Sequence, residues 1–573
     1  MTFVPSDSQR DLIEKPGSVF VEACPGAGKT QCIVERYIQR PGADQRRGVA
    51  LLSFTNAAID EVRIRCSGFP ELLLPPNFTG TIDGFINRFI VGPVYSAIHG
   101  RAPTLRDSWA RLQGTSFRVG SCPGVEFELD WFSFDESGAA KLEPVRVRSD
   151  VRWSVRNLSG RQQADASVAA ARIWTRFASH GVMDCAAART LLTTYLTDPA
   201  LAQRVQALLS SRFSEVIIDE VQDCDSTDLL LINCLLDAGI SVVMVGDMDQ
   251  SIYDFRGSSP AETRKLLERV PQGLRLDGNF RSSRRICAVV DSIRFDAIAD
   301  NAVGQWADEP HEVRVIAVPS LAHGRTRVID ALAALGLDPS ESIVLAHGEK
   351  DAAVCAGAVV QSGKRSSNRV VQIAQASHVL QDVTSSARAR KDAEQTLSAA
   401  IRTLAAEDTY GMTDAAFCDS VGISVRAYRD GCRRLANRCA PFGGPPSVFK
   451  DEIVKGVRLL GWNAWVHVGS LRIPPGDAWP ESPAEPVDAL RFSTIHSFKG
   501  LQAPSVAVAI PAGHRKFGSP LHDWLEGHET ERRRILYVGV SRAERALLFV
   551  VHESLEEVLI ECLNRDRIPF VRA

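Results

Sequence analysis

Short apolar runs that end in polar residues predict the first part of the fold. The runs consist largely of valine, isoleucine and leucine, with little alternation; they are residues 19–21, 48–54, 216–218 and 242–245. Such runs are typical of parallel strands buried on both faces, in sheets that bind ligands where the strands end. After Val21 come small residues and then the helical spacing of Ile33, Val34 and Tyr37. The pattern predicts an α/β core that opens with a strand, a loop and a helix.

A second α/β core is predicted from Leu274 onward. Its apolar runs are residues 313–318, 343–345, 506–510 and 547–551. Two stretches interrupt the strand rhythm, one without clear periodicity after Phe89 and one with a helical pattern between about Ala374 and Val466, where Gly443–Pro446 predicts a loop. We interpret both as insertions. The first core then comprises residues 1–88 and 209–273, with insertion 89–208, and the second core comprises residues 274–370 and 486–573, with insertion 371–485.

An alternating segment in the first insertion has two explanations. Val145, Val147, Val151 and Trp153 alternate with Arg146, Arg148 and Arg152. A strand pair with this pattern would collect arginines on one face, where they could contact phosphates. A solvated strand face is the more common outcome for such a pattern.

Length, charge and cysteine pattern exclude several classes of protein. A chain of 573 residues is too long for one core. The formal charge of -3 shows no overall basic signature, so any nucleic-acid surface must be a local groove. The thirteen cysteines include no C-x-x-C pair, which argues against a disulfide framework or a structural zinc site. The N-terminus lacks a signal-peptide pattern and no apolar run would span a bilayer, so we expect a cytoplasmic protein.

The segment between the first strand and the first helix is a phosphate loop. Small residues allow backbone N–H groups to surround phosphates, Lys29 adds a positive charge, and Thr30 can bind Mg²⁺. The residues expected around ATP here are Ala23, Cys24, Pro25, Gly26, Ala27, Gly28, Lys29 and Thr30. Kinases, GTPases and transporters share such loops, so the loop alone names no function.

Polar residues at the ends of two later strands indicate hydrolysis. Asp219 and Glu220 follow a buried strand, where one carboxylate can hold Mg²⁺ and the other can orient and deprotonate water. Gln250 follows the next strand and is close in sequence to Tyr253 and Phe255. This combination would connect the state of the γ-phosphate to aromatic residues that stack on bases.

The motifs together resemble those of superfamily 1A helicases of the UvrD/Rep kind. The matching segments, in the family's order from Gln9 to Arg542, are Ser6–Gln9, Ser53–Ala58, Gly80–Phe85, Asn279–Ser282, Phe492–Leu501 and Arg533–Ala543. This resemblance implies two RecA-like P-loop domains, 1A and 2A, each with an inserted subdomain, 1B and 2B. It also implies ATP and Mg²⁺ as cofactors and single-stranded or tailed duplex DNA as the partner.

The resemblance assigns roles to individual residues. Gln9 would read the adenine, Phe280 would stack on it, and Arg281 and Arg542 would reach the γ-phosphate from the second core. Gln502 stands where the family commonly has a glutamate that contacts the ribose. The residues expected to contact DNA are Phe54, Thr55, Asn56, Thr81, Asp83, Tyr253, Phe255, Arg256, Thr494 and His496.

Direction and biological role follow only from the resemblance. It implies 3′-to-5′ movement on DNA, with unwinding that depends on the insertions or on a partner. Asp83-Gly-Phe85 and the chain length also resemble the helicase subunit of the Gabija anti-phage system, which works with an endonuclease of the overcoming-lysogenization-defect (OLD) type. Three alternatives are a general DNA-repair helicase, a nucleotide- or DNA-end-sensing subunit that activates a nuclease, and, more remotely, a kinase.

Overall fold

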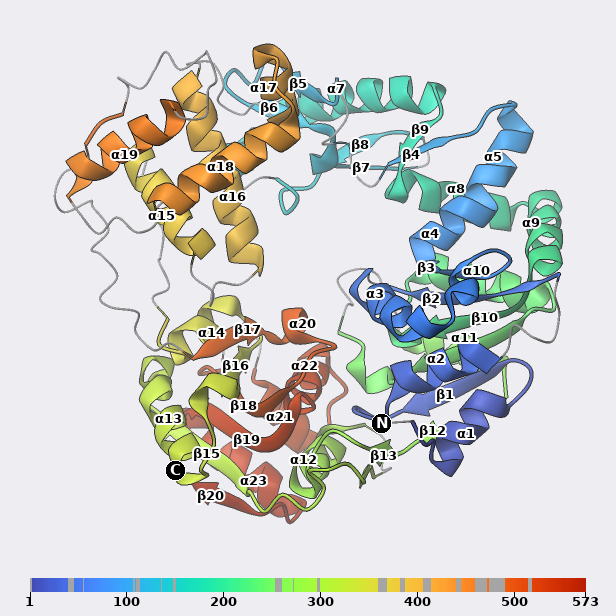
Figure 1. The fold of residues 1–573 in the computed structure, drawn as a ribbon, viewed down its shortest axis with the longest axis vertical. Coiled ribbons are helices and arrows are strands. Elements are labelled where there is room, and N and C mark those ends of the chain that lie inside the picture. Colours follow the sequence, from blue (N-terminus) through green and yellow to red (C-terminus); the bar gives the residue numbers. More distant parts are fainter. Residues whose placement is uncertain are drawn as a thin grey trace. The chain divides into compact units, whose positions relative to one another are not determined.

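The protein divides into two compact units, both seen in the computed structural model in Figure 1. Unit 1 comprises residues 1–94, 191–360 and 488–573, and unit 2 comprises residues 95–190 and 361–487. The structure describes residues 3–39, 46–54, 56–106, 109, 114–135, 137–147, 151–252, 260–271, 273–295, 299–358, 368–381, 387–405, 414–439, 445–458, 471–473, 490–513 and 518–573.

Unit 1 contains two six-stranded parallel sheets, and the first holds the phosphate loop. Its strands, in spatial order, are β12 (Leu274–Leu276), β1 (Val19–Ala23), β11 (Ser241–Gly246), β10 (Phe213–Asp219), β2 (Gly48–Ser53) and β3 (Phe78–Thr81). The predicted runs at 19–21, 48–54, 216–218 and 242–245 are thus confirmed as parallel strands. Helices of this part are α1 (Asp7–Glu14), α2 (Lys29–Gln39), α3 (Asn56–Arg65), α4 (Ile82–Ile86), α5 (Gly92–His99), α9 (Pro199–Arg212), α10 (Ser226–Asp237) and α11 (Pro260–Leu267).

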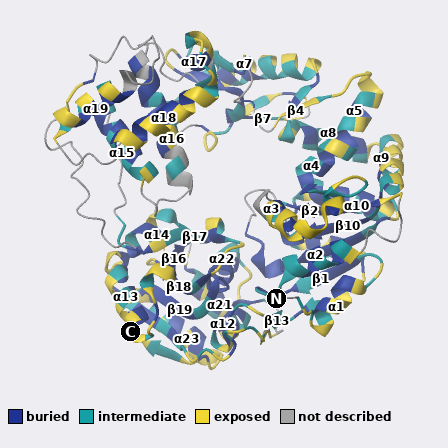
Figure 2. Ribbon diagram, viewed as in Figure 1, coloured by how far each residue is buried: buried dark blue, intermediate teal, exposed yellow. Residues whose placement is uncertain are grey.

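The second sheet has the spatial order β17 (Arg491–Thr494), β16 (Ser342–Ala346), β18 (Ala503–Ile510), β19 (Ala543–His552), β15 (Val313–Val318) and β20 (Phe570–Arg572). Its neighbouring strands are also parallel, and its predicted strands are confirmed. Its helices are α12 (Arg284–Ile293), α13 (Gly324–Ala334), α14 (Glu349–Cys355), α20 (Ile495–Phe498), α21 (Pro520–Glu526), α22 (Glu531–Val540) and α23 (Glu556–Arg565). Figure 2 shows the strands of both sheets largely in the buried colour, as expected for sheets covered on both faces.

One predicted boundary is wrong. Leu274 does not begin the second core, because β12 pairs in parallel with β1, with Leu274 opposite Val21. The sequence Leu-Arg-Leu of β12 contains no information on which sheet receives this strand. The crossing between the cores therefore follows β12, where the short pair β13 (Gly278–Asn279) and β14 (Asn301–Ala302) lies.

The first segment of unit 2 packs small strand pairs against a long helix. Its elements are β4 (Thr104–Arg106) with β9 (Val182–Asp184), β5 (Ser116–Arg118) with β6 (Glu126–Glu128), β7 (Phe132–Phe134) with β8 (Ala140–Leu142), and helices α6 (Arg152–Arg156), α7 (Gly160–Ser179) and α8 (Cys185–Thr197). The strand pair predicted across Val145–Trp153 is wrong where the structure describes this range, and Arg148 lies outside the described residues. Residues 144–147 form turns, and Trp153 is an exposed residue of α6, because aromatic residues elsewhere in this segment, such as Trp131, fill its core.

The second segment of unit 2 is helical where the structure describes it, in agreement with the helical pattern of residues 374–466. Its helices are α15 (Arg369–Gln381), α16 (Ala387–Ala405), α17 (Asp414–Val421), α18 (Val425–Cys439) and α19 (Pro446–Arg458). Most of the predicted loop at Gly443–Pro446 lies outside the described residues, and Pro446 opens α19, a position that suits proline.

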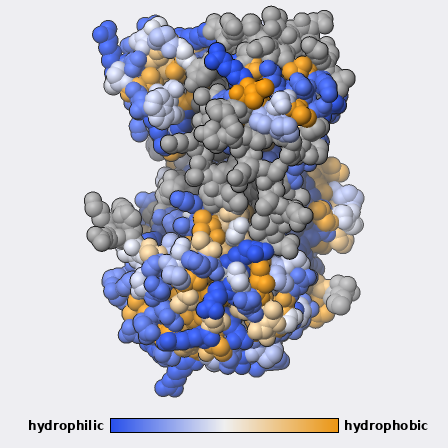
Figure 3. All heavy atoms as spheres, turned by 90° about the vertical axis from the view of Figure 1, so that its left-hand side faces the viewer, coloured by the Kyte–Doolittle hydropathy of each residue, from blue (hydrophilic) through white to orange (hydrophobic). Residues whose placement is uncertain are grey.

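None of the helices that the structure describes is both long and apolar enough to cross a bilayer. On the face turned to the viewer in Figure 3, hydrophobic and hydrophilic residues are interspersed, which is normal for protein surfaces.

Candidate nucleotide and DNA site

The phosphate loop connects β1 to α2 and depends on two glycines. Gly26 and Gly28 have φ angles of 76° and 74°, in the left-handed region that glycine adopts without strain. A Cβ atom on Gly26 would lie 2.6 Å from the Cβ of Arg281 and 2.7 Å from Asn279 Oδ1. The backbone N–H of Phe280 also donates to the carbonyl of Gly26 at 3.0 Å. The loop therefore meets the Asn279–Arg281 segment at a distance that only glycine permits.

Gln9 contacts this loop from α1. Its backbone and side chain form a capping box with Ser6, which begins the helix. The Gln9 side chain is buried, and its Nε2 donates to the carbonyl of Ala27 at 3.0 Å. Gln9 thus supports the loop directly, and its adenine-reading role stays a prediction.

The carboxylates Asp219 and Glu220 lie at the carboxyl end of β10. Glu220 has φ 56°, which is uncommon for a residue other than glycine and is typical of functional sites. Lys29 Nζ lies 3.6 Å from Glu220 Oε1, and Gln222 donates to the other carboxylate oxygen. The first helix residue after the phosphate loop and the end of a central strand therefore meet in one charged site.

Neighbouring charges separate the pKa values of the two carboxyl groups, because burial raises both. Burial and the neighbouring charge of Glu220 raise the pKa of Asp219 to about 7. For Glu220 burial also acts upward, but the positive charges of Lys29 and Lys499 outweigh it and lower the pKa to about 2. Burial alone lowers the pKa of Lys29, yet the charges of Glu220, Asp247 and Asp219 hold it above its ordinary value. At neutral pH Glu220 is ionised, whereas Asp219 is partly protonated.

Asp219 and Thr30 fit a magnesium ion. Burial, and after it the charge of Glu220, disfavours the ionised form of Asp219, and a bound cation would stabilise that form. Within the described part of the chain, no group of three or more His, Cys, Asp and Glu residues could hold a metal. Mg²⁺ at nucleotide sites needs only one or two protein ligands, because phosphates and water complete its shell.

Gln250 joins the two cores of unit 1. It ends the 3₁₀ turn Met248–Gln250 after β11, and only 3% of its surface is exposed. Its Nε2 donates to Asp247 Oδ2 at 2.8 Å, within the first core. From the second core, Arg542 donates to Gln250 Oε1 at 2.9 Å, and Lys499 Nζ donates to the Gln250 carbonyl at 2.9 Å. A displacement of Gln250 would therefore be transmitted to residues of both cores.

Lys499 also forms a buried ion pair between the cores. Its Nζ lies 2.8 Å from both carboxylate oxygens of Asp223, and the two side chains are 9% and 8% exposed. Burial raises the pKa of Asp223 to about 6, although the charge of Lys499 acts in the opposite direction. Tyr537, from α22, donates to Asp247 of the first core at 2.9 Å. Lys499 and Tyr537 lie in motifs that the resemblance identifies, but the sequence does not show that Lys499 contacts Asp223 or that Tyr537 contacts Asp247.

Arg281 and Arg542 lie close together near the phosphate loop. Their combined positive charge exceeds the negative charge of their surroundings. Arg281 Nε donates to Gln502 Oε1 at 2.9 Å, and its NH1 donates to the carbonyl of Ser541 at 2.9 Å. Burial lowers the pKa of Arg281, and burial together with the charge of Arg281 lowers that of Arg542 to about 9. Two arginines held by neutral acceptors favour a polyanion such as a triphosphate.

Phe280 lies on the surface beside the loop, and 41% of it is exposed. An aromatic ring left in water next to a phosphate loop is available to stack on a base. Gln502, predicted near the ribose, is exposed and accepts the hydrogen bond from Arg281. Its amide also bonds Glu544, a carboxylate whose pKa burial raises. The structure thus brings Phe280, Arg281 and Gln502 together on one side of the phosphate loop.

The predicted DNA contacts are only partly described. Thr55, Tyr253, Phe255 and Arg256 lie outside the described residues, and of Asn56 only its place at the start of α3 is described. Thr81 and Thr494 each end an edge strand and cap the following helix, accepting from Gly84 N and Ser497 N at 3.1 Å. Phe54 follows β2, Asp83 lies in the first turn of α4, and His496 lies in α20 with its ring centre 5.5 Å from that of His347.

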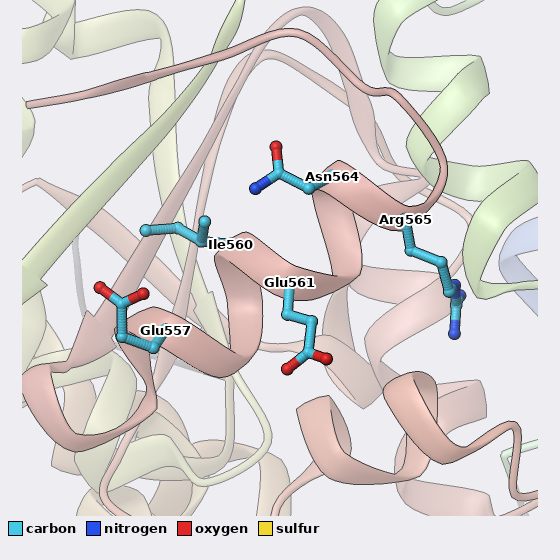
Figure 4. Close-up of a pocket in the computed structure, with 5 residues that line it drawn as sticks. All are labelled: Glu557, Ile560, Glu561, Asn564 and Arg565. Carbon is cyan, nitrogen blue, oxygen red and sulfur yellow. The ribbon is translucent and has the colours of Figure 1, made fainter.

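Thr81 and Thr494 occupy matching places in the two cores. Each lies at the carboxyl end of an edge strand, β3 in one sheet and β17 in the other, where parallel sheets bind ligands. A surface hollow elsewhere, along α23, is lined by Glu557, Ile560, Glu561, Asn564 and Arg565 (Figure 4). It contains none of the predicted nucleotide or DNA residues and has two acidic side chains, so it has no part in this site.

Comparison with known proteins points to the same class of protein as the site. The UvrD/REP helicase N-terminal domain matches residues 6–107 and 141–271. The ATP-dependent DNA helicase UvrD2 of Mycobacterium tuberculosis (strain ATCC 25618 / H37Rv) is 23% identical over 94% of this chain and 77% of its own length. DNA helicase II of Escherichia coli (strain K12) is 20% identical over 96% of this chain and 84% of its own length.

Two parallel α/β cores with a phosphate loop and paired carboxylates define a nucleotide-hydrolysing class of protein. The matched domain and the helicase relatives make the assignment more specific. Together they support a UvrD/Rep-type helicase of superfamily 1A with the activity of a DNA-dependent ATPase.

Proposed function

We propose that the protein is an ATP-driven translocase that moves 3′ to 5′ on single-stranded DNA and hydrolyses ATP between the two cores of unit 1. The observation that carries this proposal is the position of Gln250, which bonds Asp247 in its own core and Arg542 and Lys499 in the other. Contacts from both cores on one buried amide make the distance between the cores sensitive to what occupies the site.

The charges around the phosphate loop support hydrolysis. Lys29, Arg281 and Arg542 bind the phosphates, and Thr30 and Asp219 would hold Mg²⁺, which neutralises charge on the phosphates when bound. Glu220 orients water and accepts its proton. Lys29 lies beside Glu220 and keeps its pKa low. Phosphates that draw Lys29 away would raise the basicity of Glu220 when water must be activated.

Movement on DNA follows from a cleft that closes and opens. Gln250 is followed closely by Tyr253, Phe255 and Arg256, which we propose to contact bases and phosphates. Stacking on aromatic rings tolerates any base, so alternate gripping and release would advance the protein along any sequence. In this proposal unit 1 contains domains 1A and 2A, and the two segments of unit 2 are subdomains 1B and 2B.

The proposed biological role is anti-phage defence with a partner nuclease of the OLD type. Its support is the resemblance at Asp83-Gly-Phe85. Co-purification with the product of the neighbouring gene, followed by cleavage assays on each subunit and on the mixture, tests this role. A protein that binds no nuclease and unwinds tailed duplexes processively on its own would favour a general repair helicase.

The motor itself is tested by ATP hydrolysis with and without single-stranded DNA and by unwinding of duplexes with 3′ or 5′ tails. DNA should stimulate hydrolysis, and 3′-tailed duplexes should be the better substrates. Lys29→Ala and Glu220→Gln serve as controls without hydrolysis. Hydrolysis that DNA does not stimulate would refute the translocase, and preference for 5′ tails would refute the direction.

A further inference from the structure

Arg294 is a buried cation that contacts three different segments of unit 1. It directly follows α12, lies outside the motif segments that the resemblance identifies, and its side chain is 3% exposed. Its NH1 donates to Asp300 Oδ1 at 2.7 Å, and its NH2 donates to the hydroxyl of Tyr537 at 2.7 Å. Its Nε lies 3.5 Å from Asp249 Oδ2. The planar fork of an arginine can serve three such groups at once, whereas a lysine ammonium is a compact point charge.

The three partners of this guanidinium belong to different parts of unit 1. Asp249 lies in the 3₁₀ turn after β11, in the first core, and Tyr537 lies in α22 of the second core. Asp300 directly precedes β14, in the segment that crosses between the cores. In that segment β14 pairs with β13, whose Asn279 accepts the backbone N–H of Arg281 at 2.9 Å. One side chain therefore connects both cores and the segment between them.

The hydrogen bonds beyond Arg294 have a fixed direction. A guanidinium can only donate, so the Tyr537 hydroxyl accepts from Arg294 and gives its single proton to Asp247 Oδ2, 2.9 Å away. Burial and the charge of Asp247 raise the pKa of Tyr537, which keeps that proton on the hydroxyl. The same Asp247 oxygen accepts from Gln250 Nε2 at 2.8 Å. The amide of Gln250 is thereby held with its nitrogen toward Asp247 and its oxygen toward Arg542.

The orientation of the Gln250 amide determines which of its atoms Arg542 meets. In the observed orientation Arg542 donates to Gln250 Oε1 at 2.9 Å. A reversed amide would place its NH₂ group against the guanidinium of Arg542 and its oxygen against the carboxylate of Asp247, and both contacts are repulsive. Gln250 is buried, so water cannot readily replace these partners. The orientation thus depends on Asp247, whose carboxylate is in turn held by Tyr537.

We propose that Arg294 is a positioning residue for ATP hydrolysis, which holds Tyr537 in place and through it the amide of Gln250. The inference rests on the proposed function, in which Gln250 responds to the nucleotide between the two cores. Because Asp300 binds another nitrogen of the same guanidinium, a movement of the crossing segment would alter this chain of hydrogen bonds.

An alternative role for Arg294 is to neutralise the carboxylates around it. Besides Asp300 and Asp249, Asp291 lies within ion-pair distance of the guanidinium. A cation that only neutralised these groups could equally be a lysine. The proposal therefore requires that the geometry of the arginine, and not its charge alone, affects the rate of hydrolysis.

Two conservative variants of the full chain test the proposal. Arg294→Lys keeps the charge but removes the fork, and Tyr537→Phe keeps the ring but removes the hydroxyl. Each should lower kcat for DNA-stimulated hydrolysis by roughly tenfold or more, with the Kd for ATP changed by less than about twofold, because misplacement of a group slows the reaction without removing a contact to the nucleotide. The matched controls are Arg402→Lys and Tyr428→Phe, which change a buried, hydrogen-bonded arginine and tyrosine of unit 2 and should leave kcat unchanged.

The double variant Arg294→Lys/Tyr537→Phe shows whether the two residues act in one chain of hydrogen bonds. Its kcat should be close to that of Tyr537→Phe alone, because effects within one network do not add. In a Gln250→Ala background, Arg294→Lys should likewise lower kcat much less than it does in the wild type. Titration with ATP in the same samples shows that each variant folds.

Several results would overturn the proposal. These are a wild-type kcat in Arg294→Lys or Tyr537→Phe, effects that multiply in the double variant, an equal fall in the Gln250→Ala background, or a loss of ATP binding that parallels the loss of rate. DNA stimulation of the wild type tests the proposed function separately. A wild type that DNA does not stimulate would refute the translocase, whereas variants that hydrolyse ATP normally beside a stimulated wild type would refute only the role of Arg294.

Discussion

Removal of the Lys499 ammonium should destabilise unit 1 in a manner that depends on pH. Lys499→Met keeps the apolar stem but leaves Asp223, which is 8% exposed, without the cation that both its oxygens accept at 2.8 Å. Loss of one partner from a buried ion pair costs ~3 to 5 kcal/mol. We therefore expect the free energy of unfolding to fall by that amount at pH 8, where Asp223 is ionised.

The pH dependence follows from the acidity of Asp223. Burial raises its folded-state pKa to about 6, above the ordinary value of 3.8. The folded state then binds more protons than the unfolded state between these values, and stability decreases as pH rises through this window. Without Lys499 the folded pKa rises further, so the window extends above pH 6. At pH 5 the carboxyl group is mostly protonated with or without Lys499, and the substitution should have little effect.

Thermal unfolding at the two pH values measures this difference. The melting temperature of Lys499→Met should fall by roughly 5 °C at pH 8 and by ~1 °C or less at pH 5. Lys455→Met is the control, since Lys455 is 61% exposed and its partner Glu452 keeps Arg438 as a second cation, so its melting temperature should change little at either pH. An equal fall at both pH values, or none at pH 8, would show that the pair between the cores does not have the assigned energy.

Three further predictions concern the nucleotide site. Glu220→Gln should lower kcat for DNA-stimulated hydrolysis by roughly 10²- to 10⁴-fold with ATP binding retained, as measured by phosphate release and nucleotide titration; an equal loss of binding would contradict its role toward water. Because burial and Glu220 raise the pKa of Asp219 to about 7, the apparent affinity for Mg²⁺ in the ATPase assay should increase from pH 6 to pH 8, and a flat profile would refute Asp219 as its ligand. Gly26→Ala should weaken ATP binding by at least about tenfold, whereas Gly17→Ala, with a similar positive φ but open space around it, should not; equal effects would assign the loss to backbone strain alone.

Local patterns predicted much of the fold. Buried parallel strands need apolar residues on both faces, so runs such as Val216–Ile218 and Val506–Ile510 are visible in the chain itself and appear in β10 and β18. The phosphate loop was equally visible, because small residues and Lys29 are required within a few positions of one another. By contrast, the alternation of apolar residues and arginines over Val145–Trp153 gave a wrong prediction of strands. The described residues there form a turn and a short helix, beside a core of aromatic residues.

Residues that are neighbours along the chain were identifiable without the fold, because a strand end or a loop is built from consecutive positions. The contacts between the cores were not, since Gln250 and Arg542 are separated by 292 positions and Asp223 and Lys499 by 276. No periodicity connects such pairs. Their distances, and the burial that shifts the pKa values of Asp219 and Asp223, arise only when the chain folds and the two cores of unit 1 come into contact. The residues of each motif can therefore be identified from the sequence. The contacts between the motifs form only in the tertiary structure.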